Sequence, residues 1–440
     1  MISSLANIFK VPDLRKKILF VLFIIGLYRL GTHVPVPGID FDALERLRDE
    51  GIGGIANLVD FFSGGALERV SVFSLGIMPA ITASIIIQLL TVVIPKFEQW
   101  REEGESGQKK ITQWTRYLTL ILAVIQSSGF VYLFSQGQIT PGGGGGSIDI
   151  LGPGNHEWWR YGLMVLTMTT GTVLVMWLGE LISQRGIGNG MSLLIFASVV
   201  SALPSEGNRI WQQNPAQFFV ILMIFFAMIV AIVFIESGER RIHVQFAKRI
   251  VGRRQTQGGS TYIPLKVNTG GVIPVIFASS ILTIPALILS VVPSDGWGES
   301  LRSWVENNLQ NQTSPVYVLS YFLLVIGFSY FYNMIQFDPW RQADFLKKQG
   351  GYIPGVRPGD ATANYFSRIL NRLTLPGALY LAFVALVPLV VLAVWNVSAF
   401  TFGGVSLLIT VGVALETMKQ IDSQLTMRNY EGFLSMSRSK

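Results

Sequence analysis

Gly76-Ile-Met-Pro-Ala-Ile-Thr-Ala-Ser-Ile85 is matched far along the chain by Gly271-Val-Ile-Pro-Val-Ile-Phe-Ala-Ser-Ser280, and this pair decides the fold. Gly, Pro, the following Ile, Ala and Ser coincide at one constant offset. Each stretch opens an apolar helix with Pro in its first turn, where the missing N–H is not needed. Gly-x-x-Pro also recurs by itself in membrane helices. Because the match continues past the proline, we favour two repeated halves with a functional path between them.

The composition is that of a membrane protein. The 440 residues are 50% hydrophobic and 14% charged, with a mean hydropathy of +0.46, and runs long enough to cross a bilayer recur. The net charge of +7 falls on alternate loops, which membrane topology explains better than nucleic-acid binding does. The absence of cysteine excludes disulfides, thiol catalysis and thiolate metal sites. A basic amino-terminal segment precedes the apolar run 18–27 without a cleavage site, which predicts an uncleaved first span.

The apolar runs predict ten spans, at roughly 18–34, 73–94, 116–135, 159–182, 190–203, 215–236, 271–292, 316–336, 375–395 and 401–421. The fifth is short, and its entrance Gly186–Gly190 is either a tight loop or the first turn of a longer helix. Lys and Arg gather in the amino-terminal segment and in the loops after spans two, six and eight. The positive-inside rule therefore places both termini in the cytoplasm.

Ten spans divide into two halves, 1–203 and 204–440, with the matched stretches second in each half. An odd number of spans per half makes equivalent helices run in opposite directions, so the predicted repeat is inverted. The expected fold is an all-α polytopic membrane protein with a cleft between the halves near the midplane. The carboxyl-terminal half would carry two large cytoplasmic loops, 237–270 and 338–374.

No motif for bond chemistry is found in the sequence. It lacks a phosphate-binding P-loop, an H-E-x-x-H zinc motif and a nucleophile elbow, and its three histidines are scattered. We therefore expect no catalytic residue, metal or cofactor. Charged residues within or beside spans are candidates for ion coupling, but they lack a paired midplane carboxylate, and most lie where snorkelling or capping explains them. These candidates are Arg29, Glu180, Glu236 and Glu416.

Residues 51–72 are apolar but too short to span the membrane, and Asp60 and Gly64-Gly65 interrupt them. One interpretation is an amphipathic helix on the membrane surface. The other is a re-entrant segment, which requires that it pack within protein or line a cavity. The glycine pair would then act as its hinge.

The two large loops carry more basic residues than topology requires. Loop 237–270 contains Arg240-Arg241 and Arg253-Arg254, and loop 338–374 contains a Pro- and Gly-rich turn that displays Arg357. The surplus favours docking of an acidic partner, protein or RNA, slightly above topology alone.

Eight motifs occur in an order that resembles the bacterial SecY family, the channel subunit of the protein-conducting translocon. They are Phe62-Ser-Gly-Gly-Ala-Leu, Leu75-Gly-Ile-Met-Pro, Ala83-Ser-Ile-Ile-Ile-Gln-Leu-Leu90, Gly186-Ile-Gly-Asn-Gly190, Leu265-Lys-Val-Asn, Val272-Ile-Pro, Phe277-Ala-Ser-Ser and Pro354-Gly-Val-Arg-Pro-Gly. The resemblance runs from about the first span to the last. The Gly-rich stretch 142–146 is not part of it.

The resemblance implies an hourglass between two five-helix halves, closed at its waist by a ring of apolar side chains. By motif position the ring is Ile81, Ile85, Met191, Ile195, Ile276 and Ile409. Met191 departs from the usual branched aliphatic residue, but its flexible side chain should keep the seal. Ile81 and Ile276 are equivalent in the two matched stretches, which favours a central role over ordinary helix packing. An apolar constriction blocks ions because they lose hydration without a replacement ligand.

The resemblance also assigns a plug, a lateral gate and docking loops. The plug is segment 55–66, with Ile55, Leu58, Phe61, Phe62, Gly64 and Gly65. The lateral gate lies between spans two and three and spans seven and eight. Gln88, Thr91 and Asn268 are the expected polar contacts across it, although Asn268 is also placed to cap its helix. The docking residues are Arg240, Arg241, Arg253, Arg254 and Arg357.

The implied function is a gated, passive conduit in the bacterial plasma membrane that moves unfolded polypeptides across and releases apolar helices sideways. The implied partners are SecE, SecG, the SecA ATPase, the ribosome, signal-bearing preproteins and membrane lipids, with SecD/SecF and YidC as further partners. Two rival functions remain at this point: an ion-coupled solute transporter, which needs a midplane charge pair, and a membrane-embedded enzyme, which needs a convergent acid, base or metal site.

Overall fold

The computed structural model describes residues 11–39, 63–135, 158–246, 250–251, 254–255, 259–289, 303–310, 314–395 and 404–438. Most of these residues are helical, and the helices form two groups. The amino-terminal group is α2 (Pro12–Gly31), α5 (Met78–Val93), α6 (Pro95–Glu102), α7 (Glu105–Ser135), α8 (Trp158–Arg185) and α9 (Gly190–Gln213). The carboxyl-terminal group is α10 (Pro215–Glu236), α11 (Ile273–Leu289), the π-helix η1 (Glu306–Gln310), α13 (Pro315–Gln336), α14 (Pro339–Lys348), α15 (Asp360–Trp395) and α16 (Gly404–Arg438).

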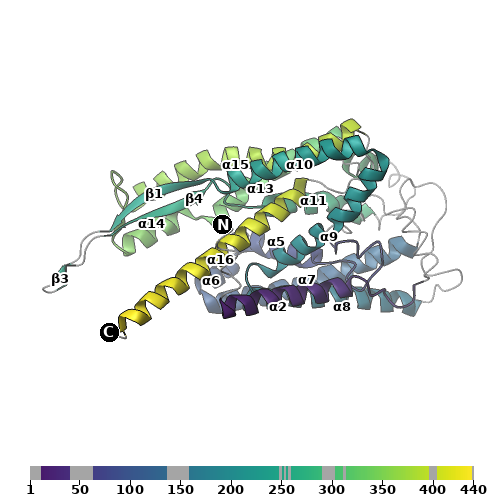
Figure 1. Ribbon diagram of the computed structural model, residues 1–440, viewed down its shortest axis with the longest axis horizontal. Coiled ribbons are helices and arrows are strands. Elements are labelled where there is room, and N and C mark those ends of the chain that lie inside the picture. Colours follow the sequence, from purple (N-terminus) through teal and green to yellow (C-terminus); the bar gives the residue numbers. More distant parts are fainter. Residues whose placement is uncertain are drawn as a thin grey trace.

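The two groups lie along opposite sides of the molecule (Figure 1). Helices α10, α13 and α15 follow one side and α2, α7 and α8 the other, with α5, α9, α11 and α16 between them. Helices α2, α5, α6, α10, α13 and α14 each have Pro at one of the first two helical positions, where its fixed φ suits the helix. Asn189 and Asn214 cap α9 and α10 with their side-chain oxygens.

A helix overlaps each of the ten predicted spans. By length and apolar composition, four stretches of the described residues are able to cross a membrane. They are Trp158–Arg185, Pro215–Glu236, Pro315–Lys348 and Asp360–Val391. A fifth is α5 with α6, bent by 98°, if that pair is one span. The chain is therefore a multi-pass membrane protein, although several predicted spans are shorter or carry more charge than this criterion allows.

Several helix ends differ from the predicted span boundaries for identifiable reasons. Helix α9 continues through Pro204 to Gln213, so the predicted division at residue 203 falls inside a helix. The chain breaks instead at Asn214, whose Oδ1 accepts from the amide of Ala216 at 3.0 Å. Helices α7 and α15 begin well before their apolar parts, because a helix can continue past the hydrophobic layer. The apolar pattern detects only the part that lies in that layer.

The two matched stretches have the same local geometry. Gly76 and Gly271 both have left-handed φ values, 53° and 58°, which a residue with a side chain rarely adopts. Helix α5 starts at Met78 and α11 at Ile273, each two residues after its glycine. The left-handed glycine turns the chain into the helix at the same point in both stretches.

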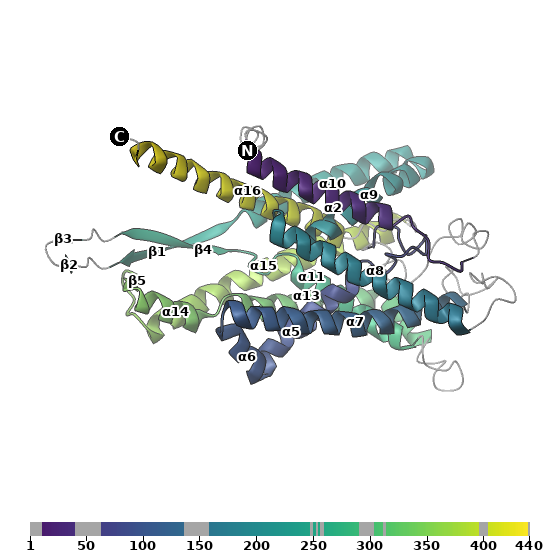
Figure 2. The ribbon, with the colours of Figure 1, turned by 90° about the horizontal axis from the view of Figure 1, so that it is seen from below.

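A small sheet departs from the predicted all-α fold. Strand β1 (Glu239–Phe246) pairs antiparallel with β4 (Ser260–Lys266), and β5 (Gly351–Tyr352) adds to its other edge. A second, two-stranded sheet joins β2 (Ile250–Val251) to β3 (Arg254–Gln255). Tyr352 also donates its hydroxyl to Gln245 Oε1 at 3.1 Å, so the two basic loops are joined. The sheet projects from one end of the molecule, beside α14 and the carboxyl end of α16 (Figure 2).

Candidate functional site

The predicted ring residues lie where the two helical groups meet. Ile195 of α9, Ile276 of α11 and Ile409 of α16 are buried in one apolar cluster, and Ile81 and Met191 pack against it. Ile85 belongs to a neighbouring cluster with Phe277 and Tyr332, against which Ile81 also packs. We call these six residues the waist. All six therefore lie in two adjoining clusters rather than on the outer faces of the helices.

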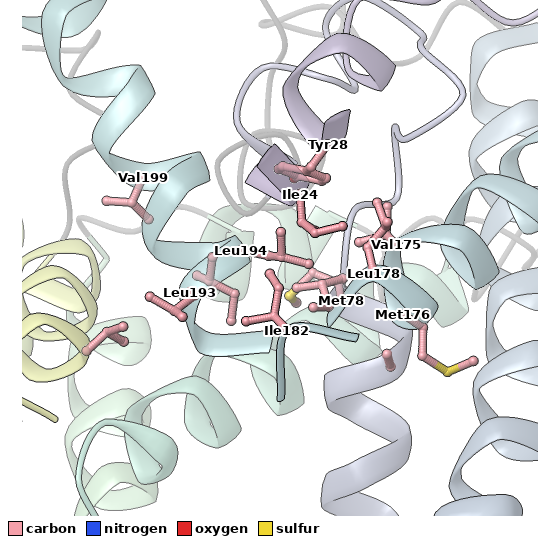
Figure 3. Packing of buried hydrophobic residues seen from close by; sticks show 14 of the residues in the cluster. Ile24, Tyr28, Met78, Val175, Met176, Leu178, Ile182, Leu193, Leu194 and Val199 are labelled. Atoms are coloured by element: carbon pink, nitrogen blue, oxygen red, sulfur yellow. The ribbon is translucent and has the colours of Figure 1, made fainter. Parts of the chain in front are cut away.

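The rest of the larger cluster comes mainly from the amino-terminal group. Figure 3 shows side chains of α2, α5, α8 and α9, among them Ile24, Met78, Ile182 and Leu194, pointing toward one another. The waist is thus backed on that side by a packed apolar core. A hydrated ion entering it would lose water and meet no side chain able to replace that water.

A cavity of about 300 Å³ opens beside the waist. Ile195, Ile276 and Ile409 form its apolar part. Its other lining residues include polar and charged side chains: Asn189, Ser192, Glu236, Lys266, Asn268, Gln336, Glu416 and Lys419. Because Lys266 ends strand β4, the cavity faces the end of the molecule that bears the sheet. We call this cavity the polar vestibule: part of its wall is polar and charged, and the part formed by Ile195, Ile276 and Ile409 is apolar.

Only the end of the predicted plug lies within the described residues. Ile55, Leu58, Phe61 and Phe62 lie outside them. Gly64 and Gly65 have left-handed φ values of 71° and 83°, so the chain turns there, as a hinge requires.

Two neighbouring residues of α2 hold this turn. Tyr28 donates its hydroxyl to the carbonyl of Ser63 at 3.1 Å, and the same hydroxyl lies 2.8 Å from Ser198 Oγ. Arg29 Nη1 donates to the carbonyl of Gly64 at 3.1 Å, and Nη2 donates to that of Ala197 at 2.9 Å. Arg29, a sequence candidate for ion coupling, instead binds backbone carbonyls, and no sequence pattern indicated these partners.

The predicted lateral-gate residues bond within their own helical groups. Gln88 Nε2 donates to Ser84 Oγ at 3.3 Å, and Thr91 Oγ1 donates to the carbonyl of Gln88 at 2.6 Å, both within α5. Asn268 Nδ2 donates to Glu236 Oε2 at 3.1 Å and to the carbonyl of Gly271 at 3.0 Å.

The expected polar contacts between these three residues across the gate are therefore absent from the described structure. Hydroxyl and amide groups readily bond to nearby groups of their own helix or turn instead. Between α5 and the carboxyl-terminal group, the contact is apolar: Ile85 packs with Phe277 of α11 and Tyr332 of α13. We call this contact the seam.

Three of the four charged residues considered for ion coupling, Arg29, Glu180 and Glu236, have structural partners. Glu180 of α8 accepts two hydrogen bonds from Arg116 of α7, one from Nε to Oε1 at 2.8 Å and one from Nη2 to Oε2. Glu236 accepts from Asn268. Among the residues that the structure describes, no group of three His, Cys, Asp or Glu side chains is placed to hold a metal ion.

The predicted docking residues lie on the projecting sheet and the turn beside it. Arg240 and Arg241 are exposed on β1, and Arg241 pairs with Glu239 at 2.8 Å. Arg254 lies on β3, and Arg253 is outside the described residues. Arg357 is exposed between Gly355 and Gly359, whose φ values are 82° and 101°. The glycines thus form the turn that the sequence predicted around Arg357.

Comparison with known proteins identifies the family. The family described as SecY matches residues 71–418. Protein translocase subunit SecY of Streptomyces galbus is 50% identical over 453 residues, covering 99% of this chain and 100% of the relative. The subunit of Corynebacterium glutamicum is 49% identical over 443 residues, covering 98% and 100%.

Solved structures agree on the fold. The chain is similar to one described as a protein conducting channel, with a TM-score of 0.60 and 18% identity over 91% of this chain and 90% of the other. It is similar to Sec61 in a canine ribosome-channel complex, with a TM-score of 0.58 and 18% identity over 91% and 90%. At these identities the likeness shows the fold alone. From the match of 71–418 and the full-length relatives, the chain belongs to the SecY family.

Proposed function

We propose that this protein is a gated protein-conducting channel that moves unfolded secretory polypeptides across the bacterial plasma membrane and releases transmembrane segments sideways into it. The observation that carries the proposal is the waist, in which Ile195 meets Ile276 and Ile409 beside a polar vestibule. Apolar side chains that part and reseal around an extended chain hold back hydrated ions without binding the substrate tightly. The channel catalyses no bond chemistry, and the SecY family is one of channels rather than enzymes.

The proposed architecture has ten spans in two inverted groups of five around an hourglass pore, with both termini in the cytoplasm. The break at Asn214 replaces residue 203 as the division between the groups. The six residues of the waist form the pore ring. Segment 55–66 is the plug, and one solved SecY neighbour is described by the role of its plug domain in stabilising the closed state and maintaining a membrane seal.

The lateral gate is the seam together with the polar residues near it, Gln88, Thr91 and Asn268. Because their hydrogen bonds stay within their own helical groups, these residues set how polar the gate is for an entering signal helix. A polar contact between membrane helices is worth only about 1 kcal/mol. That is small enough for an apolar signal helix to displace.

Work for transport comes from partners. SecA or an elongating ribosome supplies it, and SecE and SecG complete the complex, with SecD/SecF and YidC as further partners. The docking surface consists of the exposed arginines Arg240, Arg241 and Arg357 together with Arg253 and Arg254 of loop 237–270. Two structural neighbours, canine Sec61 and yeast Ssh1, are described in complexes with the ribosome.

The test is transport into proteoliposomes that contain the purified complex of this chain. A signal-bearing preprotein should become protected from added protease in the presence of SecA and ATP, and a preprotein without its signal should not. Equal protection of both preproteins, or none of either, would contradict the proposed function.

A further inference from the structure

A hydrogen bond between α6 and α13 joins the two helical groups at the end of the molecule that bears the sheet. Arg101 Nη2, in α6, donates to the backbone carbonyl of Ile335, in α13, at 2.9 Å. Ile335 lies one turn beyond Tyr332, which belongs to the seam. The polar contact therefore extends the apolar seam toward its outer end.

The sequence explains why this carbonyl is available. In a continuing helix the carbonyl of Ile335 would accept from the amide four residues later, but that residue is Pro339, which has no N–H. Helix α13 ends at Gln336, and the amide of Phe337 bonds to the carbonyl of Asn333. Ile335 thus presents an unused acceptor at the negative end of a helix, where a cation binds favourably.

Helix α6 is held rigidly enough to position this arginine. It turns 98° from α5 and packs on α7. Gly107 permits the contact, since a Cβ there would come within 1.7 Å of the carbonyl oxygen of Trp100. The Trp100 ring lies against Phe97, with centroids 5.1 Å apart, and under the ammonium of Lys110, which is 5.8 Å from its centroid. These contacts fix the position of Arg101 relative to α7.

We propose that Arg101 is a latch across the seam: it caps α13 from the opposite helical group and must release before α5 can separate from α11 and α13. This inference rests on the proposed function, because it concerns the gate through which signal helices would leave. It assigns to Arg101 a positioning role rather than contact with the substrate. Arg101 affects how readily the seam opens. Its loss should therefore change the transport of preproteins with weak signals most.

The first experiment tests the seam without transport. Because the chain has no cysteine, Ile85→Cys provides a single probe in the seam, and Phe226→Cys, at a side chain 69% exposed on α10, provides a probe outside it. Adding Arg101→Gln should raise the rate of N-ethylmaleimide labelling at position 85 about threefold to tenfold, as expected for loss of a charge-assisted hydrogen bond in a partly exposed site. Labelling at position 226 should stay unchanged, which controls for general unfolding.

The second experiment measures transport of two preproteins, one with a full signal and one with a shortened apolar signal. Arg101→Gln should raise the ratio of weak-signal to full-signal transport by about the same factor, and Arg101→Lys should restore part of the stringency. Lys109→Gln is the matched control, because Lys109 is 78% exposed and pairs with Glu105 of its own helix. A labelling rate at position 85 and a transport ratio that match the Lys109→Gln control would overturn the latch. An equal fall in the transport of both preproteins would also overturn the latch, because it would assign Arg101 to docking of the motor. Absence of transport by the unaltered protein would instead contradict the proposed function. The labelling rate at position 85 would still test the latch, because it does not depend on transport.

Discussion

Arg29 Nη1 donates to the carbonyl oxygen of Gly64 at 3.1 Å, and the same guanidinium bonds to Ala197 of α9. A charged side chain of the first helix thus ties the turn that ends the predicted plug to the helix that contributes Ile195 to the waist. The turn depends on glycine, because Gly64 adopts a left-handed φ that a residue with a side chain rarely adopts. We infer that the plug is anchored at this turn.

Arg29→Gln should weaken the anchor and raise the resting ion conductance of the channel. A charge-assisted hydrogen bond contributes about 1.5–3 kcal/mol, so loss of both bonds corresponds to more than a tenfold shift in the anchoring equilibrium. The measurement is current across planar bilayers without substrate. Arg29→Lys, which keeps the charge but cannot form the two-armed contact, should lie between the variant and the unaltered protein. Conductance unchanged in Arg29→Gln would show that the turn needs no anchor.

Gly64→Ala should destabilise the protein more than Gly65→Ala does. Both glycines have left-handed φ values, so alanine brings a similar backbone strain of roughly 1–2 kcal/mol at each position. At Gly64, however, a Cβ would lie 3.0 Å from both Arg29 Nη1 and Ser198 Cα, whereas at Gly65 nothing lies within 4 Å. Thermal unfolding of the two variants in the same detergent gives the comparison. Equal midpoints would argue against close packing of Gly64 on α9.

Ile195→Asn should open the seal at the waist. The amide would offer hydrogen bonds to water where the unaltered cluster offers none, so resting conductance should rise and selectivity for a full signal should fall. Leu222→Asn, at a side chain 53% exposed on α10, is the control for a polar residue in an apolar helix. If both variants leak equally, the leak reports membrane-helix damage rather than the waist.

Arg357→Glu should impair transport driven by SecA, because reversal of an exposed charge turns attraction to an acidic partner into repulsion. We expect a fall of about tenfold or more at low salt. Because the Arg357 side chain is exposed, the melting temperature should stay the same. Lys109→Glu reverses an exposed charge on α7 that is not one of the docking residues, and should have little effect. Normal transport by Arg357→Glu would remove this residue from the docking surface.

The sequence predicts the apolar parts of this protein better than its polar contacts. The matched glycines and prolines located the starts of α5 and α11, because left-handed φ and a proline-led first turn are local requirements. The waist could be proposed from motif position, and its residues do lie in two adjoining clusters.

The polar contacts depend on tertiary distance, which no local pattern encodes. Arg29 and Arg101 bind carbonyls of segments far away in sequence, and Gln88 and Thr91 bond within their own helix rather than across the gate. Strand pairing between β1 and β4 was missed, because its charged, partly exposed residues resemble those of a basic loop.

The most direct test of the central claim is a crosslink between a moving polypeptide and the waist. The substrate is a secretory chain with one cysteine, and a folded carboxyl-terminal domain arrests it midway. The channel carries a single cysteine at Ile276 or, as the control, at Phe226 on the outer face of α10. An oxidant then allows a disulfide to form between the two cysteines. Passage through the waist should give a disulfide adduct at position 276 that requires SecA, ATP and the signal, with none at position 226. Absence of the adduct at 276, or equal adducts at both positions, would contradict passage of the polypeptide through the waist.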